Sequence, residues 1–134
     1  MSVDHAKHNE DLCLKLFAEN NWNDWVVTTA FYSAIHYVDN RIFPLKIKEK
    51  EYHNIDEYVL TCTDGIKSKH DARTKLVKHH AHKAFPAYKL LRDTCRTARY
   101  NDYKLSDAMA EAATKQLALI KSLCTSSSVK IKEA

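Results

Sequence analysis

The stretch VVTTAFYSAIHYVDNRI, residues 26–42, decides which class of fold the sequence predicts. Its apolar residues recur at intervals of three and four, the spacing that places side chains on one face of an α-helix. Phe43 and Pro44 then end the predicted helix, because proline lacks a backbone N–H and restricts the residue before it. We expect a buried central helix over residues 24–42, with an apolar face formed by Val27, Phe31, Ala34, Ile35, Val38 and Ile42.

The composition of the whole chain also favours helices. The 134 residues include one glycine and two prolines, whereas these two residue types make up about 12% of an average protein. Sandwiches and barrels use them in frequent turns, and phosphate-binding α/β folds need a glycine cluster. We therefore predict an all-α protein with one core of four or five helices, in which residues 1–124 form a single domain and residues 125–134 a flexible tail.

Breaks in the apolar pattern predict the boundaries of the other elements. We expect helices over residues 4–20, 66–83, 86–100 and 107–123, and a charged loop followed by a short helix at residues 52–61. The residues expected at helix ends are Asn23 or Asp24 before the central helix, Gly65 after the short helix, Pro86 in a first turn, and Ser106 or Asp107 before the last helix.

The sequence predicts a cytoplasmic protein without a membrane segment. No apolar run approaches the roughly 20 residues of a membrane span, and the polar N-terminus lacks the apolar stretch of a signal peptide. The cysteines include no CxxC pair, so we expect small core residues in a reducing compartment rather than disulfides. They are Cys13, Cys62, Cys95 and Cys124.

The formal net charge of +4 is unevenly distributed along the chain. Residues 1–64 contain 6 lysines and arginines against 11 acidic residues, whereas residues 65–134 contain 15 against 6. Within residues 66–104 there are 11 basic residues against 3 acidic ones. A basic half joined to an acidic half indicates either a surface that faces a polyanion or scattered lysines that are simply solvated.

The central helix has a second face that is polar and aromatic. This face is too aromatic for a purely solvated surface and too polar for a plain core, so it indicates a subunit interface, a ligand surface or both. In the alternative interpretation, Tyr32 and His36 are bonded to neighbouring helices within the fold. The residues of this face are Trp25, Thr29, Tyr32, Ser33, His36 and Asn40, of which we select Trp25, Thr29, Tyr32 and His36 as candidate dimer-interface residues.

The helix expected over residues 66–83 has polar groups on its inward side. Positions 66, 70, 73, 77, 80 and 84 share one seam, which places His70, Arg73 and His80 on or beside it. Burying an arginine is costly unless it is paired. This seam therefore either faces a crevice or meets carboxylates and carbonyls across the bundle as an internal polar network.

The helix expected over residues 86–100 carries a basic stripe beside an apolar one. Arginine forks suit phosphate oxygens, and the rings of Tyr100 and Tyr103 offer stacking surfaces for bases. The candidate residues for binding nucleic acid or nucleotide are His36, His70, Lys89, Arg92, Arg96, Arg99 and Tyr100.

The sequence lacks the usual motifs of metal and nucleophile chemistry. His79, His80 and His82 lie close together, but no cysteine or carboxylate follows at a ligand-like spacing. HExxH, GxSxG and phosphate-loop motifs do not occur. We therefore expect neither a metal site nor a cofactor.

Three segments resemble the HEPN domain family, small helical bundles named for their occurrence in higher eukaryotes and prokaryotes and for nucleotide binding. Residues 26–42 are similar to the second-helix signature, in which an aromatic residue, a tyrosine, two small residues and an aliphatic residue precede a histidine. KHDARTKLV, residues 69–77, is similar to a His-x-x-Arg segment of one prokaryotic branch. AYKLLRDTCRTARYND, residues 87–102, resembles the closing helix of that branch.

The resemblance implies a four- or five-helix up-and-down bundle that commonly forms a homodimer with a polar cleft at or near the interface. Many HEPN proteins are metal-independent ribonucleases or toxins that use an arginine and a histidine a few residues apart. Arg73 with His79 or His80 fits this spacing, whereas Thr74 departs from the Asn, Asp or His usual after the arginine. Other HEPN domains bind nucleotide, nucleic acid or a partner nucleotidyltransferase.

Three functions are compatible with these patterns. The first is a homodimer that binds RNA or nucleotide through its basic helical face. The second is a metal-independent ribonuclease, in which His79 or His80 deprotonates the 2′-hydroxyl and Arg73 holds the phosphate. The third is a protein-interaction module that uses the polar and aromatic face of the central helix.

Overall fold

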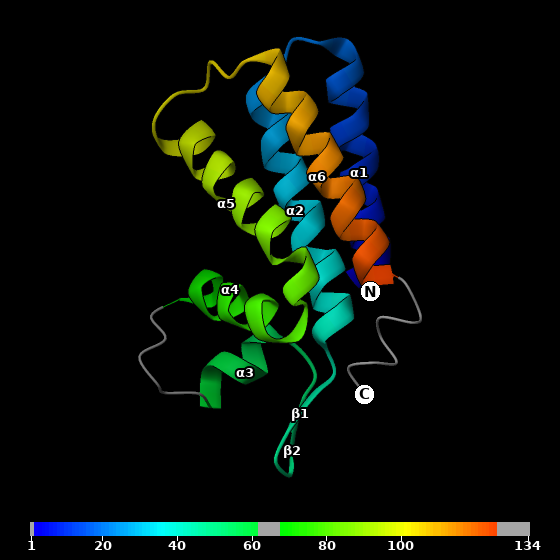
Figure 1. Cartoon of the computed structure of the whole chain (residues 1–134), viewed down its shortest axis with the longest axis vertical. Helices are drawn as coiled ribbons and strands as arrows, with labels where there is room; N and C mark the ends of the chain where they lie inside the picture. The colour runs from blue at the N-terminus through cyan, green and yellow to red at the C-terminus, as the bar shows by residue number, and fades with distance from the viewer. Residues whose placement is uncertain (1, 62–67, 126–134) are drawn as a thin grey trace.

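The computed structural model describes residues 2–61 and 68–125, and Figure 1 shows their arrangement. This part of the chain is mostly helical, as the composition predicts, with one small two-stranded sheet. The elements are α1 (Ser2–Glu19), α2 (Asn23–Ile42), β1 (Leu45–Ile47), β2 (Lys50–Tyr52), α3 (Ile55–Thr61), α4 (Lys69–His80), the 3-10 turn η1 (His82–Ala84), α5 (Phe85–Tyr100) and α6 (Asp107–Thr125).

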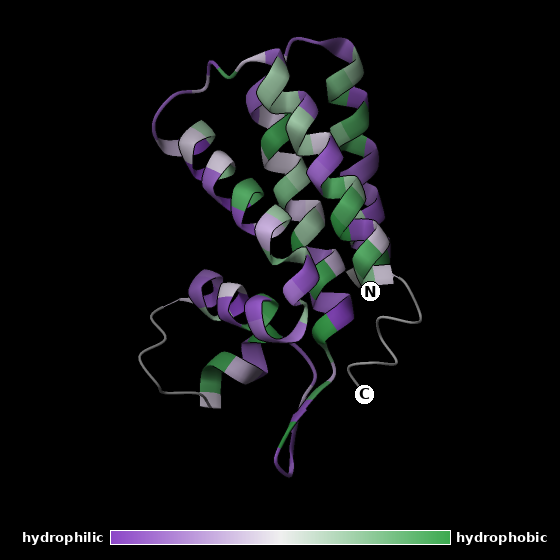
Figure 2. Ribbon diagram, in the orientation of Figure 1, coloured by the Kyte–Doolittle hydropathy of each residue, from purple (hydrophilic) through white to green (hydrophobic). Residues whose placement is uncertain are grey.

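Helix α2 lies at the centre of the core. It packs against α1, α5 and α6, and in Figure 1 α1 and α5 run opposite to α2 and α6. All six residues of the predicted apolar face are buried. In Figure 2, α4 is mostly hydrophilic, whereas α2 and α6 carry long hydrophobic segments. The apolar face of α2 therefore organises the long helices, and α4 lies across the end of this group.

The helix expected over residues 66–83 is shorter than predicted. Residues 66 and 67 lie outside the described residues, and α4 begins after Ser68, whose hydroxyl accepts a hydrogen bond from the backbone N–H of Asp71 at 3.1 Å. At Ala81 the backbone leaves the helical region, with φ −144° and ψ 48°. The predicted seam is therefore wrong at its end, because Ala84 belongs to η1 and not to α4.

The segment expected as a charged loop contains an antiparallel hairpin. β1 pairs with β2 in a register that places Ile47 opposite Lys50, and Lys48 in the turn has a φ of 57°. The turn lacks the glycine that usually signals such a hairpin. Helix α3 begins at Ile55 rather than near residue 52, because the side chain of Asn54 accepts a hydrogen bond from the backbone N–H of Glu57 at 2.9 Å.

The predicted cap of the central helix is also wrong. Trp22 occupies the N-cap position of α2, without a side-chain cap bond. The Asn23 amide instead donates to the backbone carbonyl of Leu105 and to Asp107 Oδ1, both at 2.9 Å, and so links the starts of α2 and α6. Ser106 caps α6 as predicted, since its hydroxyl accepts a hydrogen bond from the backbone N–H of Met109 at 3.1 Å.

An ion pair between α2 and α4 fixes α4 against the long helices. Arg73 Nε and Nη2 donate to Asp39 Oδ1 and Oδ2 at 2.8 and 3.0 Å. The two side chains are 7% and 15% exposed. This contact is the internal polar pairing that the sequence left open as one explanation for Arg73. Two parallel hydrogen bonds fix the orientation of both side chains, so they also fix how α4 lies on α2.

Removing one partner of this pair should destabilise the fold strongly. Asp39→Ala leaves the Arg73 guanidinium buried without a counter-charge, which we expect to cost about 3–5 kcal/mol of the free energy of unfolding. Urea unfolding measures this loss. The control is Asp11→Ala, which breaks an exposed pair with Lys7 and should cost at most about 1 kcal/mol.

A double variant separates the charge effect from a packing effect. Asp39→Leu with Arg73→Met removes both charges and should recover most of the stability lost in Asp39→Ala, because a buried ion pair is often replaceable by apolar groups. Equal losses in Asp39→Ala and Asp11→Ala would contradict this view of the pair.

Candidate nucleic-acid interface

A cleft of about 270 Å³ lies where α4 and α5 meet α2. We call it the arginine cleft. It brings together five of the seven residues predicted to bind nucleic acid or nucleotide, namely His70, Arg92, Arg96, Arg99 and Tyr100. The complete lining is Phe31 and Tyr32 of α2, Ser68, His70 and Asp71 at the start of α4, and Arg92, Cys95, Arg96, Arg99 and Tyr100 of α5.

The amphipathic sequence of α5 places the arginines in this cleft. The predicted apolar stripe of the helix is buried in the core. Residues three and four apart share a face of a helix, so Arg92, Arg96 and Arg99 lie together on the side that borders the cleft. The buried stripe consists of Tyr88, Leu91, Cys95 and Ala98.

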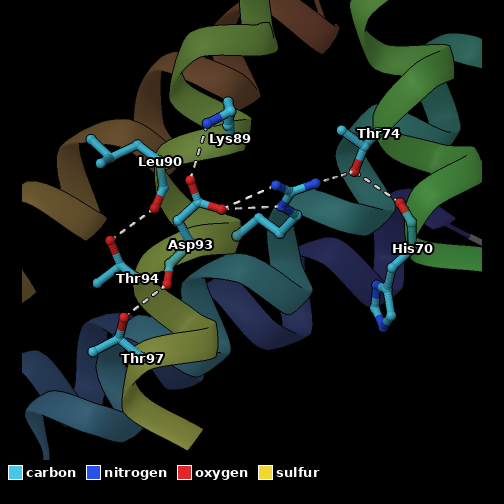
Figure 3. A network of polar contacts seen from close by, with 8 residues as sticks. His70, Thr74, Lys89, Leu90, Asp93, Thr94 and Thr97 are labelled. Carbon is cyan, nitrogen blue, oxygen red and sulfur yellow. Dashed lines mark hydrogen bonds and ion pairs between the residues drawn. The ribbon is translucent and has the colours of Figure 1, made fainter. Parts of the chain in front are cut away.

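Arg92 is held in place by contacts on both sides. Its Nη1 donates to Thr74 Oγ1 at 3.1 Å, and its Nε and Nη2 lie 3.3 and 3.1 Å from Asp93 Oδ1. Figure 3 shows the surrounding network, in which Thr74 donates to the backbone carbonyl of His70 and Lys89 contacts Asp93. Although partial burial opposes it, hydrogen bonds from Arg92 and Lys89 lower the pKa of Asp93. Lys89 pairs with Asp93 and does not line the cleft.

Arg99 is surrounded by aromatic rings. Its Nη1 donates a hydrogen bond to the hydroxyl of Tyr32. The guanidinium carbon lies 5.9 Å from the ring centroid of Tyr32 and 5.6 Å from that of Tyr100, within the range of cation–π attraction. Tyr32, selected from the sequence for a dimer interface, therefore lies beside Arg99 in the cleft.

Arg96 has the least engaged guanidinium of the three. It is exposed, and it makes no hydrogen bond or ion pair with residues 2–61 or 68–125. All of its N–H donors are therefore available to a ligand, as far as this part of the chain is concerned. The three arginines thus differ in their partners. Arg92 contacts a carboxylate, and Arg99 contacts a hydroxyl and two aromatic rings, whereas Arg96 makes no hydrogen bond or ion pair with the described residues.

His70 also lines the arginine cleft. Figure 3 shows its ring extending away from Thr74, and its centroid lies 6.2 Å from that of Phe31. Burial, followed by the nearby charges of Arg73 and Arg99, lowers the pKa of His70. The lowered pKa favours the neutral ring, whereas an anion in the cleft would favour its protonation.

The face of α2 selected for a dimer interface is not one continuous surface. Trp25 is 54% exposed, but Thr29 is buried and its hydroxyl donates to the Trp25 carbonyl at 2.7 Å. His36 stacks on His5 of α1, with ring centroids 3.8 Å apart. His36 does not line the arginine cleft. The stacking of His36 on His5 therefore agrees better with the alternative interpretation, in which His36 contacts a neighbouring helix, than with a dimer interface.

The three residues predicted for catalysis do not line the arginine cleft. Arg73 is buried against Asp39. His79, near the C-terminal end of α4, is exposed, and His80 is partly buried. None of the three is among the lining residues.

No group of three or more His, Cys, Asp or Glu side chains that could hold a metal ion occurs within the described ranges. Cys13, Cys95 and Cys124 are buried free thiols, and Cys62 lies outside the described residues. None of the helices in these ranges is long and apolar enough to cross a membrane.

Sequence reasoning missed several residues of the cleft. Phe31 was expected only as a core residue, yet it also forms part of the cleft lining. Ser68 and Asp71 join the lining from the start of α4. Their spacing is that of a helix-capping pair, a signal that marks a helix start but does not reveal which arginines lie beside it.

No family model, curated protein or solved structure matches this chain. The geometry of the chain itself therefore carries the functional argument.

The partly buried ring of His36, which stacks on His5, should make stability depend on pH. Burial, followed by the charge of His5, lowers the pKa of His36 in the folded state below its usual 6.5. The unfolded chain therefore binds the proton more tightly, so this contribution is complete above about pH 6.5 and is lost as the pH falls through the folded-state pKa. His36→Phe keeps a ring against His5 but cannot titrate, and it should lose less stability between about pH 7 and 5 in thermal unfolding. Identical pH profiles for the two proteins would contradict this assignment.

Proposed function

We propose that this protein binds RNA or a nucleotide through the arginine cleft, by hydrogen bonds from arginine guanidinium groups to phosphate oxygens. One observation carries the proposal: Arg92, Arg96 and Arg99 lie in one cleft whose described lining includes a single acidic residue, Asp71. Guanidinium groups match the geometry of phosphate oxygens and form charge-assisted hydrogen bonds with them.

The three arginines have different parts in this proposal. Arg96 supplies the most available donors, because none of them is bonded to the described part of the chain. Arg99 carries its charge between Tyr32 and Tyr100, rings on which a base can stack. Arg92 is oriented by Thr74 and Asp93, which occupy several of its N–H donors. It therefore contributes mainly positive charge to the cleft rather than free donors.

The geometry favours binding over RNA cleavage by Arg73. Two nitrogens of Arg73 are bonded to Asp39, and its side chain is 7% exposed. A ribonuclease built on Arg73 with His79 or His80 would need the guanidinium to reach the phosphate being cleaved. The cleft arginines require no such rearrangement.

The HEPN-like assignment belongs to the same proposal. It is supported by the motifs in residues 26–42, 69–77 and 87–102, which contribute residues of α2, α4 and α5 to the cleft. The resemblance also implies an up-and-down bundle, a homodimer and association with a nucleotidyltransferase. Light scattering across a range of protein concentrations tests the homodimer.

Phosphate contacts predict a strong salt dependence and a strong dependence on Arg96. With three phosphates neutralised, the affinity for a short single-stranded RNA should fall about 20-fold between about 50 and 200 mM salt. Arg96→Ala should weaken binding at low salt. It should also reduce the slope of log affinity against log salt concentration by the amount expected for about one phosphate contact. Fluorescence anisotropy with labelled RNA measures both effects.

The matched control is Lys115→Ala, which removes one positive charge from the exposed side of α6. Loss of affinity equal to that of Arg96→Ala would mean that net charge, and not the cleft, determines binding. Absence of RNA or nucleotide binding by the wild-type protein at low salt would end the proposal.

Binding should also take up a proton at His70. Burial lowers the pKa of this ring most, followed by the charges of Arg73 and Arg99 and, less strongly, of Lys69, whereas the charge of Asp71 raises it. Because a phosphate beside the ring raises this pKa, affinity for RNA should increase as the pH falls from about 8 to about 6. In His70→Gln this increase should be smaller. An unchanged pH dependence in the variant would place the proton uptake elsewhere.

A further inference from the structure

A second cleft, of about 290 Å³, shares Arg99 with the arginine cleft. Arg99 therefore stands between two hollows, one rich in arginine and one with aromatic side chains. Both are close to the lower end of the roughly 300–1,000 Å³ that is typical of small-molecule sites, so each suits one unit of a larger ligand. The second cleft is lined by Asp24, Trp25 and Thr28 of α2, Ala98 and Arg99 of α5, and Tyr103 in the loop that follows.

The two aromatic side chains of the second cleft are largely exposed to solvent and do not belong to the core. Trp25 is 54% exposed and Tyr103 is 65% exposed. They come from the first turn of α2 and from the loop after α5, and the cleft brings them together. Exposed rings next to a cationic groove are the usual platform for stacking nucleic-acid bases.

Asp24 adds a polar group to this aromatic cleft. Its backbone carbonyl accepts a hydrogen bond from Thr28 at 2.8 Å, but its carboxylate makes no hydrogen bond or ion pair with the described parts of the chain. An ionised carboxylate can only accept hydrogen bonds, through two oxygens side by side. Among the bases, guanine presents two adjacent N–H donors, at N1 and N2, that match this pair of acceptors.

We propose that the second cleft holds a guanine base of a single-stranded RNA whose neighbouring phosphates lie in the arginine cleft. This inference rests on the proposed function of the arginine cleft. Trp25 and Tyr103 supply stacking surfaces for the base, and Asp24 accepts hydrogen bonds from its N1–H and N2–H. Arg99, which lines both clefts, contacts the phosphate between the base site and the arginine cleft.

The charges of the two clefts favour this placement, with the base in the second cleft and the phosphates in the arginine cleft. In the arginine cleft three arginines outweigh Asp71, whereas in the second cleft Arg99 alone balances Asp24, so Asp24 is better suited to a base edge than to the backbone. Arg92 and Arg96 line the arginine cleft and not the second one. The division of charge therefore places the backbone on one side of Arg99 and the base on the other.

Base preference tests this inference directly. Labelled uridine hexamers, with or without one central guanosine or adenosine, are titrated with the protein and followed by fluorescence anisotropy. The guanosine hexamer should bind at least about fivefold more tightly than the other two. This factor is the lower end of the discrimination that two hydrogen bonds to one base provide. Asp24→Asn replaces one acceptor by a donor and should remove the preference for guanosine over adenosine.

Stacking is tested with variants of the aromatic residues. Trp25→Ala should weaken binding of the guanosine hexamer at least about fivefold, and Tyr103→Ala should act in the same direction. The matched control is Trp22→Ala, since Trp22 is also exposed, at 46%, but lines neither cleft. Thermal unfolding verifies that each variant folds. Because Tyr103 lies in the loop between α5 and α6, Tyr103→Ala changes no helical residue.

The outcomes separate this inference from the function on which it rests. If no hexamer binds the wild-type protein, the proposed function fails and this inference with it. If the hexamers bind in a way that depends on Arg96, but with equal affinities, the base site is overturned and phosphate binding stands. The base site is also overturned if Trp25→Ala changes the oligomeric state and leaves RNA affinity unchanged, because Trp25 then belongs to a protein interface.

Discussion

The ion pair between Arg73 and Asp39 fixes how α4 lies against the long helices, and the arginine cleft depends on this placement. It joins the middle of α4 to the C-terminal half of the central helix by two parallel hydrogen bonds. Since the pair is almost completely buried, neither side chain can leave the other without a large loss of stability. The orientation of α4 follows from this contact, and with it the positions of Ser68, His70 and Asp71 in the wall of the arginine cleft.

The same ion pair influences the electrostatics of the cleft. The charge of Arg73 contributes to the lowered pKa of His70 and, less strongly, to that of His36. Burial lowers both pKa values most, and the charge of Arg73 adds to this effect at His70 without Arg73 itself lining the cleft. On the opposite wall, the amphipathic helix α5 presents arginines with different degrees of internal pairing. The result is a cleft with fixed positive groups at its sides and available donors on Arg96.

Much of the fold could be predicted because α2 and α5 follow simple helical periodicity. The apolar faces of these helices are buried as expected, and Arg92, Arg96 and Arg99 border the cleft because the basic stripe of α5 lies beside the buried apolar stripe. The four candidate residues of α5 other than Lys89 share the cleft with His70 for the same reason. Periodicity within a helix is local information, and it is sufficient for these assignments.

The remaining features depend on contacts between distant residues. The partner of Arg73 lies 34 positions away in the sequence, so the pattern of α4 alone could not distinguish a crevice from an internal pair. Asn23 was expected to cap α2 but bonds to residues more than 80 positions away. Thr29 and Tyr32 have similar positions in the helical pattern, yet one is buried and the other borders a cleft. These differences arise from packing, which a single sequence does not display.

The most direct test of the central claim is a map of where RNA binds. In a ¹H–¹⁵N NMR titration with a short single-stranded RNA, we expect the largest shifts at the Nε–H groups of Arg96 and Arg99 and at the amides around His70. Resonances on the exposed side of α6 should move little. The largest shifts on α6, or no shifts at all, would contradict the assignment of the arginine cleft as the binding site.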